Sequence, residues 1–210
     1  NVSGQGTTTA VPPTGLVASA ILTTSCNLNC NPVIGASSYV VGESSTTGGP
    51  YTQISTPPTD ATTIINLLPA TTYYFVEAAM VAGKQSGWSN EVKVVTTLNS
   101  PGNTAATPAS NGSTTINLSW SAPTGGAKGY IVKRGTVNGG PYTQIATTTT
   151  ALTYSDSNIT AGVTYFYVID ATANGVTSPD SRQVEASAGV ATPTGMTASY
   201  SSNGVYMHCN

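Results

Sequence analysis

Apolar and polar residues alternate along short segments of this chain, which is the pattern of half-buried β-strands. In the segment 116–120, Ile116, Leu118 and Trp120 share one face, and residues 165–171 repeat the alternation. Turns rich in Gly, Pro and Asn separate such segments at intervals of about 8–12 residues. Seven short strands in such a unit therefore predict an all-β domain folded as a β-sandwich.

A seven-residue string shows that this unit occurs twice. Gly-Gly-Pro-Tyr-Thr-Gln-Ile stands at 48–54 and again, letter for letter, at 139–145, which is 91 positions later. The chain has 210 residues, enough for two domains of about 100 residues each. We predict an N-terminal linker or strand at 1–10, a first domain at 11–98 and a second at 99–190.

The offset of 91 also predicts the register of the tyrosine strand in the first domain. It aligns Tyr74 with Tyr165 and turns Glu77 to the outside, which avoids burying a carboxylate without a partner. The residues predicted to face inward are then Tyr74, Val76, Ala78 and Met80, and in the second domain Tyr165, Tyr167, Ile169 and Ala171.

This register leaves apolar residues on the outer face in both domains. They are Tyr73 and Phe75 in the first domain and Phe166 and Val168 in the second. An apolar row repeated at matching positions predicts a lateral surface for self-association. Scattered exposure of single aromatic side chains is the alternative, since it is common on protein surfaces.

A third copy begins near the end of the chain. Residues 193–199 resemble 13–19, and 205–210 resemble 26–31, so 191–210 is predicted to be the first two strands of a partial third unit. Val205, Met207 and Cys209 would form an apolar row there. A two-stranded hairpin is marginal alone, so either a longer array continues or the tail is donated to a neighbouring subunit.

Together these residues resemble the fibronectin type III family. The resemblance rests on Trp120, on Tyr39-x-Val41 and Tyr130-x-Val132, on a tyrosine-corner pattern that ends at Tyr165, and on Gly-x-x-Ser-x-x-Ser at 83–89 and 175–181. It implies two tandem seven-stranded, immunoglobulin-like sandwiches of a secreted, microbial protein. The first domain has Cys30 where the second has Trp120, and we expect Trp88 to fill that space.

The three cysteines are predicted to be buried. Cys26 and Cys30 lie four residues apart on one strand, about 13 Å, whereas a disulfide needs Cα atoms within about 7 Å. Repeat alignment turns both of them and Cys209 inward. An intermolecular disulfide through Cys209 is the functional alternative, and no ligand spacing for zinc is present.

Composition argues against several functions. Charged residues are 7% of the chain and Lys plus Arg number six, too few for a nucleic-acid surface. The sequence has no run of 18 apolar residues, so it predicts no transmembrane helix. The single histidine, His208, lacks a nucleophile motif, and the eight acidic residues form no catalytic pair. We predict a non-enzymatic protein without cofactor or metal.

The functional expectation is an extracellular structural or adhesive protein. Near-identical domains and a partial third unit favour assembly with other copies of the chain into a fibre or surface array. The alternatives are a spacer or accessory module of a secreted polysaccharide-degrading enzyme, and a viral tail or capsid decoration domain that binds glycans. Asn-x-Ser/Thr sequences make Asn1, Asn111, Asn117 and Asn158 candidate glycosylation sites.

Overall fold

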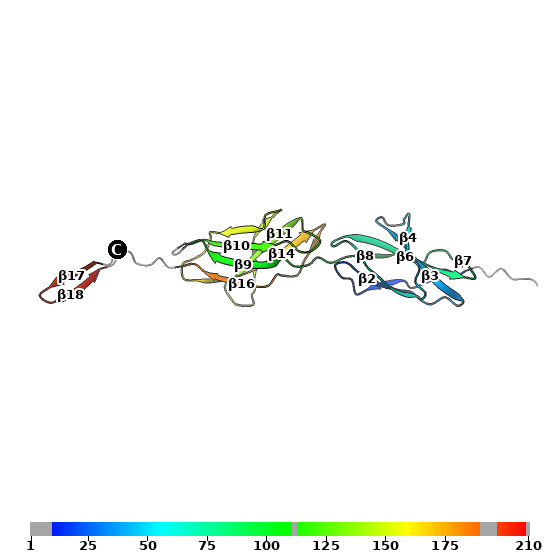
Figure 1. Ribbon diagram of the computed structural model, residues 1–210, viewed down its shortest axis with the longest axis horizontal. Coiled ribbons are helices and arrows are strands. Elements are labelled where there is room, and N and C mark those ends of the chain that lie inside the picture. Colours follow the sequence, from blue (N-terminus) through cyan, green and yellow to red (C-terminus); the bar gives the residue numbers. More distant parts are fainter. Residues whose placement is uncertain (1–9, 111–112, 190–196, 209–210) are drawn as a thin grey trace, which may run out of the picture. The chain divides into compact units, whose positions relative to one another are not determined.

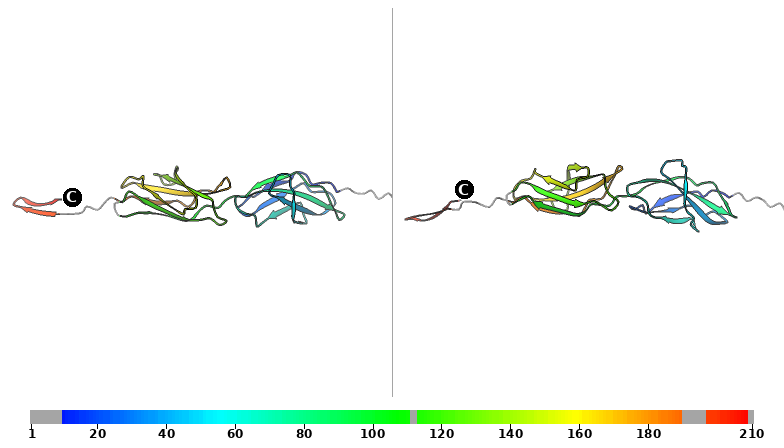
Figure 2. Two further views of the ribbon diagram at one scale, coloured as in Figure 1. Left: turned by 90° about the horizontal axis from the view of Figure 1, so that it is seen from above. Right: turned by 45° about the horizontal axis from the view of Figure 1, so that its top comes forward.

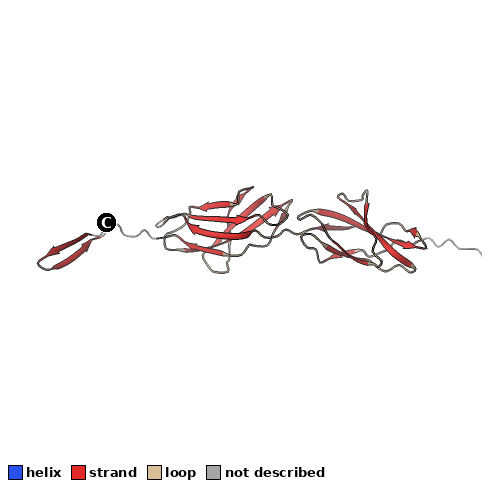
Figure 3. Cartoon of the chain, in the orientation of Figure 1, coloured by secondary structure: helices blue, strands red, loops and turns tan. Residues whose placement is uncertain are grey.

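The computed structural model describes residues 10–110, 113–189 and 197–208. The described residues form strands and turns and no helix (Figure 3). The chain divides into two compact units that change over between Asn99 and Ser100. The expectation of an all-β protein with two sandwiches is therefore confirmed.

The first unit has two facing sheets (Figure 1). One sheet has the strand order β1-β2-β5, and the other has β4-β3-β6-β7 with β8 paired to β6. The strands are β1 (Val17–Ser19), β2 (Cys26–Asn29), β3 (Ala36–Ser44), β4 (Thr52–Ser55), β5 (Ala61–Ile64), β6 (Thr72–Val81), β7 (Lys84–Gln85) and β8 (Val92–Val95). The core between the sheets includes Leu28, Tyr39, Val41, Phe75 and Val94.

The second unit repeats this topology, and Figure 2 shows its two layers from other directions. Its sheets have the orders β9-β10-β13 and β12-β11-β14-β15, with β16 paired to β14. The strands are β9 (Gly102–Pro108), β10 (Ile116–Ser121), β11 (Gly129–Gly135), β12 (Thr143–Thr148), β13 (Thr153–Asp156), β14 (Thr164–Ala173), β15 (Val176–Thr177) and β16 (Val184–Ser187). Trp120 packs edge-on against Tyr130 in its core, with ring centroids 5.4 Å apart.

The predicted register of β6 is wrong by one residue. Val41 pairs with Glu77, and its counterpart Val132 pairs with Ile169, so the offset on this strand is 92 and not 91. Tyr73, Phe75 and Glu77 accordingly face the interior. A slip of one residue turns every side chain of a strand to the other face, so Glu77 is buried against expectation.

The offset between the two units changes from 91 to 92 between the fourth and fifth strands of a unit. Strand β12 has six residues and its counterpart β4 has four. By the next strand the offset is already 92, because Ile64 pairs with Cys26 as Asp156 pairs with Ile116. The additional residue of the second unit therefore lies in the threonine-rich stretch 146–152.

Two of the cysteine predictions are confirmed and one lies outside the described residues. Cys26 and Cys30 are buried free thiols in the core of the first unit. Cys209 is not among the described residues. The prediction for Trp88 is wrong, because its ring lies beside Tyr51 and Gly42 and not among the core residues that surround Cys30.

The tail forms a hairpin of β17 (Thr197–Ser201) and β18 (Gly204–His208). Ala198 pairs with Met207 in this hairpin, just as Ala18 pairs with Leu28 in the β1–β2 hairpin. The same match holds for the neighbouring pairs, so the tail has the backbone register of the first two strands of a domain.

Candidate functional site

The predicted lateral row for self-association is not a surface. Phe75 is fully buried and Val168 nearly so, Phe166 is 9% exposed, and Tyr73 packs against the core of the first unit. Phe75 and Tyr73 also stack on each other, with ring centroids 5.9 Å apart. The structure therefore removes these four residues as contacts to other copies.

The predicted tail contacts are only partly described. Val205 on β18 is 57% exposed. Met207 belongs to the same strand, opposite Ala198, and Cys209 lies outside the described residues. The role of these residues in self-association stays a prediction.

Each unit has a tyrosine corner at the start of its long central strand. The Thr160 amide donates a hydrogen bond to the Tyr165 hydroxyl at 3.0 Å, and the Leu68 amide donates one to the Tyr73 hydroxyl at 2.8 Å. The corner predicted in the second unit is therefore confirmed. In the first unit the corner tyrosine is Tyr73, which agrees with the offset of 92.

The repeated serines extend the hydrogen bonding of the central strands. Amides of Glu77 and Ala79 donate to the hydroxyls of Ser89 and Ser86, at 3.0 and 2.9 Å. In the second unit Ile169 and Ala171 donate in the same way to Ser181 and Ser178, both at 2.9 Å. The Gly-x-x-Ser-x-x-Ser pattern thus satisfies backbone amides of the central strand between its two short partner strands, which is a structural role.

The repeated Gly-Gly-Pro-Tyr string forms a loop in each unit. The side chain of the residue that directly precedes the last strand of the unit holds this loop in place. Both glycines have positive φ in each copy, a conformation that side chains rarely adopt. In the first unit Glu91 accepts hydrogen bonds from the Tyr51 hydroxyl, from Gly48 N at 2.8 Å and from the Thr47 hydroxyl at 2.7 Å.

The second unit holds its loop with an uncharged residue. The side-chain oxygen of Gln183 accepts hydrogen bonds from the Tyr142 hydroxyl and from Gly139 N, the latter at 2.8 Å. In the first unit the residue that holds the loop is a carboxyl group, which titrates. The Tyr51 hydroxyl, with further help from Gly48 and Thr47, lowers the pKa of Glu91, while the hydrogen bond to Glu91 raises the pKa of Tyr51 to about 12.

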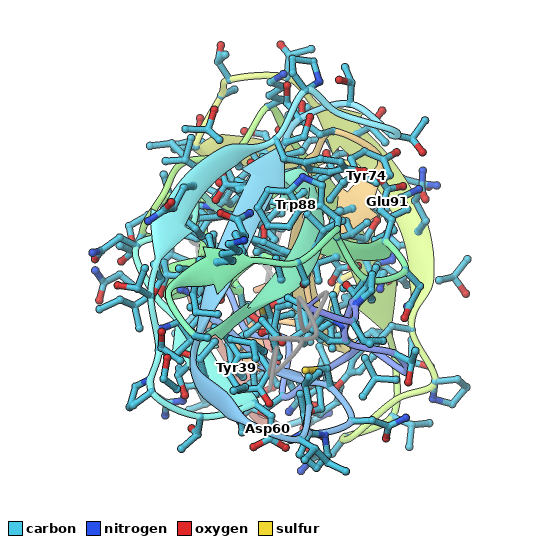
Figure 4. All side chains as sticks on the ribbon, turned by 90° about the vertical axis from the view of Figure 1, so that its right-hand side faces the viewer. Tyr39, Asp60, Tyr74, Trp88 and Glu91 are labelled. Atoms are coloured by element: carbon cyan, nitrogen blue, oxygen red, sulfur yellow. The ribbon has the colours of Figure 1, made fainter. Side chains whose placement is uncertain are left out.

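The outer face of the larger sheet is covered differently in the two units. In the first unit Trp88 lies over Gly42, where an added Cβ would come within 3.1 Å of the indole, and its ring centroid is 6.0 Å from that of Tyr51. Trp88 and Glu91 lie on one side of the unit in Figure 4, apart from Tyr39 and Asp60.

Three charged residues occupy the same positions in the second unit. Lys133, Asp170 and Asp180 stand where the first unit has Gly42, Ala78 and Trp88. Lys133 Nζ lies 2.5 Å from Asp170 Oδ2 and 2.8 Å from Asp180 Oδ1. Burial, followed by the neighbouring Asp180, raises the pKa of Asp170 to about 6, and the two partners lower the pKa of Asp180.

A second polar cluster lies inside the second unit. Asp156 is buried and accepts hydrogen bonds from Arg134 Nη1 at 2.8 Å and from the Tyr167 hydroxyl at 2.9 Å. Arg134 also lies over the Tyr165 ring at 4.9 Å. Burial and the carboxylate of Asp156 raise the pKa of Tyr167. Every member of this cluster has a partner, so it is an internal brace with no free nucleophile.

The glycosylation candidates are described only in the second unit. Asn117 is exposed on β10, where its side-chain oxygen accepts a hydrogen bond from Ser155, and Asn158 is exposed after β13. Asn1 and Asn111 lie outside the described residues. Exposure permits modification at Asn117 and Asn158, which remain predictions.

Catalytic and metal chemistry have no visible centre in the described ranges. Within them, no group of three or more His, Cys, Asp or Glu side chains is placed to hold a metal ion. A hollow of about 330 Å³ in the first unit lies between residues 10–14 and 31–34 and has no charged lining residue. Across the same described residues, no helix is long and apolar enough to cross a membrane.

Segments of this chain are similar to short parts of two larger enzymes. A stretch of 71 residues is 42% identical to an amylopullulanase of Thermoanaerobacterium saccharolyticum and covers 34% of this chain and 5% of that protein. A stretch of 120 residues is 36% identical to exoglucanase B of Cellulomonas fimi and covers 51% of this chain and 10% of the enzyme. The chain thus spans a small part of these relatives, and no family model matches it.

Among solved structures, a two-domain fibronectin type III segment from chicken tenascin superposes with a TM-score of 0.69. The match covers 83% of this chain and 98% of the tenascin segment, at 17% sequence identity. At this identity the comparison concerns the fold alone, and it includes both units in tandem.

Proposed function

We propose that this chain, a tandem pair of fibronectin type III domains, serves as a non-catalytic spacer or accessory module of a polysaccharide-degrading enzyme. The observation that carries the proposal is the 36–42% identity to segments of an exoglucanase and an amylopullulanase. Those segments make up 10% and 5% of the two enzymes. A module of this size inside a much larger enzyme can set the distance between other domains.

The internal bracing of the units supports a spacer. The tyrosine corners, the serine contacts and the hydrogen bonds by which Glu91 and Gln183 hold their loops (the loop locks) recur in both copies. All of them are intramolecular. Side chains that hold loops and sheet edges within a domain favour a stiff unit. Burial of Phe75, Phe166 and Val168 further removes the lateral row that fibre formation was expected to use.

The proposal also places the chain outside the cell. A polymer too large to enter a cell has to be degraded outside it, and a module of such an enzyme shares that location. Glycans on Asn117 or Asn158 are compatible with this location, because both side chains are exposed.

Domain exchange tests the spacer role. The segment of the Thermoanaerobacterium saccharolyticum amylopullulanase that matches this chain is deleted in one variant and replaced by the matching residues of this chain in another. We expect deletion to lower activity on polymeric substrate and replacement to restore it, with little change on a short oligosaccharide. Failure of the replacement to restore activity, in a variant that folds, would refute the proposal.

A second candidate function, assembly with other copies of the chain, is favoured by one observation. The β17–β18 hairpin has the register of the β1–β2 hairpin, so its backbone is arranged to pair with further strands of a domain. A neighbouring copy could supply such a strand. Light scattering of the full chain and of a variant lacking 197–208 tests this candidate. It requires a mass above that of one chain for the full chain, and the mass of one chain for the variant.

A further inference from the structure

Glu77 is the least expected buried group of the first unit. Its side chain is fully buried on β6, between the two sheets. Neither carboxylate oxygen makes a well-formed hydrogen bond with a described residue. Buried carboxyl groups are almost always paired or hydrogen-bonded, because burial of an unpaired charge costs several kcal/mol. The position therefore needs an explanation.

The fold itself does not require a carboxyl group at this position. Ile169 stands there in the second unit, paired with Val132 as Glu77 pairs with Val41. The opposing strand differs as well, since Cys30 lies where the second unit has Trp120. The Cys30 thiol is close enough to interact with the Glu77 carboxyl.

No positive charge faces Glu77 from the elements packed around it. The two lysines of the first unit, Lys84 and Lys93, are exposed. The titratable groups on the core side of neighbouring elements are neutral or acidic: Cys26 on β2, Cys30 directly after β2, Tyr39 and Glu43 on β3, Asp60 before β5, and Tyr73 on β6 itself. Burial raises the pKa of Glu77, Asp60 raises it further, and the Cys30 thiol opposes both.

We infer that Glu77 makes the stability of the first unit sensitive to pH. The unit stays folded while this carboxyl is neutral, and its strands open by unfolding more often when the carboxyl ionises. The second unit has Ile169 at the same position and so lacks an ionisable group there. The inference is independent of the spacer role, because it concerns when one unit opens and not what the chain connects.

The direction of the effect follows from linkage. A carboxyl whose pKa is raised in the folded state holds its proton more tightly there than in the open chain. The contribution of Glu77 to the stability of the first unit is therefore fully present below the ordinary pKa of glutamate, 4.5. This contribution falls as pH rises through the folded-state pKa and then levels off. Between those two values, one proton lost per opening makes the opening constant rise about tenfold for each pH unit.

Hydrogen exchange of the full chain, read by mass spectrometry and corrected for the intrinsic rate, tests this inference. Peptides from β2, β3 and β6 report on the first unit, and those from β10, β11 and β14 report on the second. As pH is raised from about 4.5, we expect opening of the first unit to increase about tenfold per unit until it levels off. The second unit is expected to respond only up to about pH 6, through the raised pKa of Asp170.

Two variants separate ionisation from packing. Glu77→Ile reproduces the residue of the second unit, and Glu77→Gln keeps the shape of the side chain without an ionisable proton. Both are expected to lose the pH response of the first-unit peptides. The inference is overturned if the wild-type first unit shows no rise in opening over this pH range, or if both variants keep the wild-type slope.

Discussion

The Tyr73 hydroxyl accepts a hydrogen bond from the Leu68 amide at 2.8 Å, and this contact determines which tyrosine begins the central strand of the first unit. Tyr165 makes the same contact with Thr160 at 3.0 Å. Both acceptors lie five residues after their donors. The two strands are therefore equivalent at an offset of 92, which turns Glu77 inward and buries Phe75.

Removal of the corner hydroxyl tests this assignment. Tyr73→Phe leaves the Leu68 amide without its partner and is expected to lower the free energy of unfolding of the first unit by about 1 kcal/mol. Tyr74→Phe is the matched control and is expected to have little effect, since no corner contact involves Tyr74. Urea denaturation measures both, and equal losses would contradict the assignment.

The loop lock at Glu91 makes a prediction about acid. Hydrogen bonds from Tyr51, Gly48 and Thr47 lower the pKa of Glu91, so they stabilise the loop above the ordinary carboxyl pKa of 4.5. Their contribution is lost as pH falls through the lowered value. Hydrogen exchange of residues 45–53 is expected to accelerate in that acidic range.

Glu91→Gln provides the control for this loop, because Gln183 holds the second loop without a charge. The variant should keep the loop closed at neutral pH and remove the acid-dependent part of the exchange. An unchanged acid response in Glu91→Gln would assign that response to another group.

Exchange of the outer-face residues tests whether the indole of the first unit and the ion cluster of the second are equivalent ways of covering the sheet. Trp88→Asp removes the ring that covers Gly42 and leaves a carboxylate without a lysine at position 42. We expect a loss of about 2 kcal/mol in the first unit, toward the lower end for deletion of a large side chain because Trp88 is partly exposed.

The compensated variant Gly42→Lys/Ala78→Asp/Trp88→Asp installs the three residues of the second unit. Thermal unfolding is expected to show part of the lost stability restored. If the triple variant is no more stable than Trp88→Asp alone, the two arrangements are not interchangeable solutions.

The polar cluster of the second unit predicts a strong asymmetry between single and combined changes. Asp156→Ala leaves the Arg134 charge and the Tyr167 hydroxyl without their acceptor and is expected to cost about 3 kcal/mol. The combination Arg134→Met/Asp156→Ile/Tyr167→Phe removes all three polar groups and is expected to cost less. Guanidinium denaturation compares them, and a larger loss in the triple variant would contradict this account.

The repeated string at 48–54 and 139–145 was sufficient to predict two sandwiches, because strand spacing and turn residues agree in both copies. The register failed since β6 is buried on both faces: Phe75 and Ala79 on one side, Val76 and Ala78 on the other. A strand covered on both sides loses the alternation that reveals its orientation. The two remaining guides, the offset of 91 and the expected exclusion of Glu77 from the core, both gave the wrong register.

A better signal was present in the sequence. Leu67 precedes Tyr73 by six residues, as Ile159 precedes Tyr165, and both Leu67 and Ile159 are buried. Alignment on this corner gives the offset of 92. The ion cluster at Lys133 and the contacts that Glu91 makes with the 47–51 loop join residues from different strands and loops, far apart in the sequence, which spacing within one strand does not reveal.

The mass of the full chain in solution tests the central claim most directly. Sedimentation velocity over a wide range of protein concentration is expected to show one species near 21.2 kDa, because Phe75, Phe166 and Val168 are buried and Tyr73 packs against the core. A mass that grows with concentration, in the wild-type chain and equally in a variant lacking residues 197–208, would contradict the spacer account.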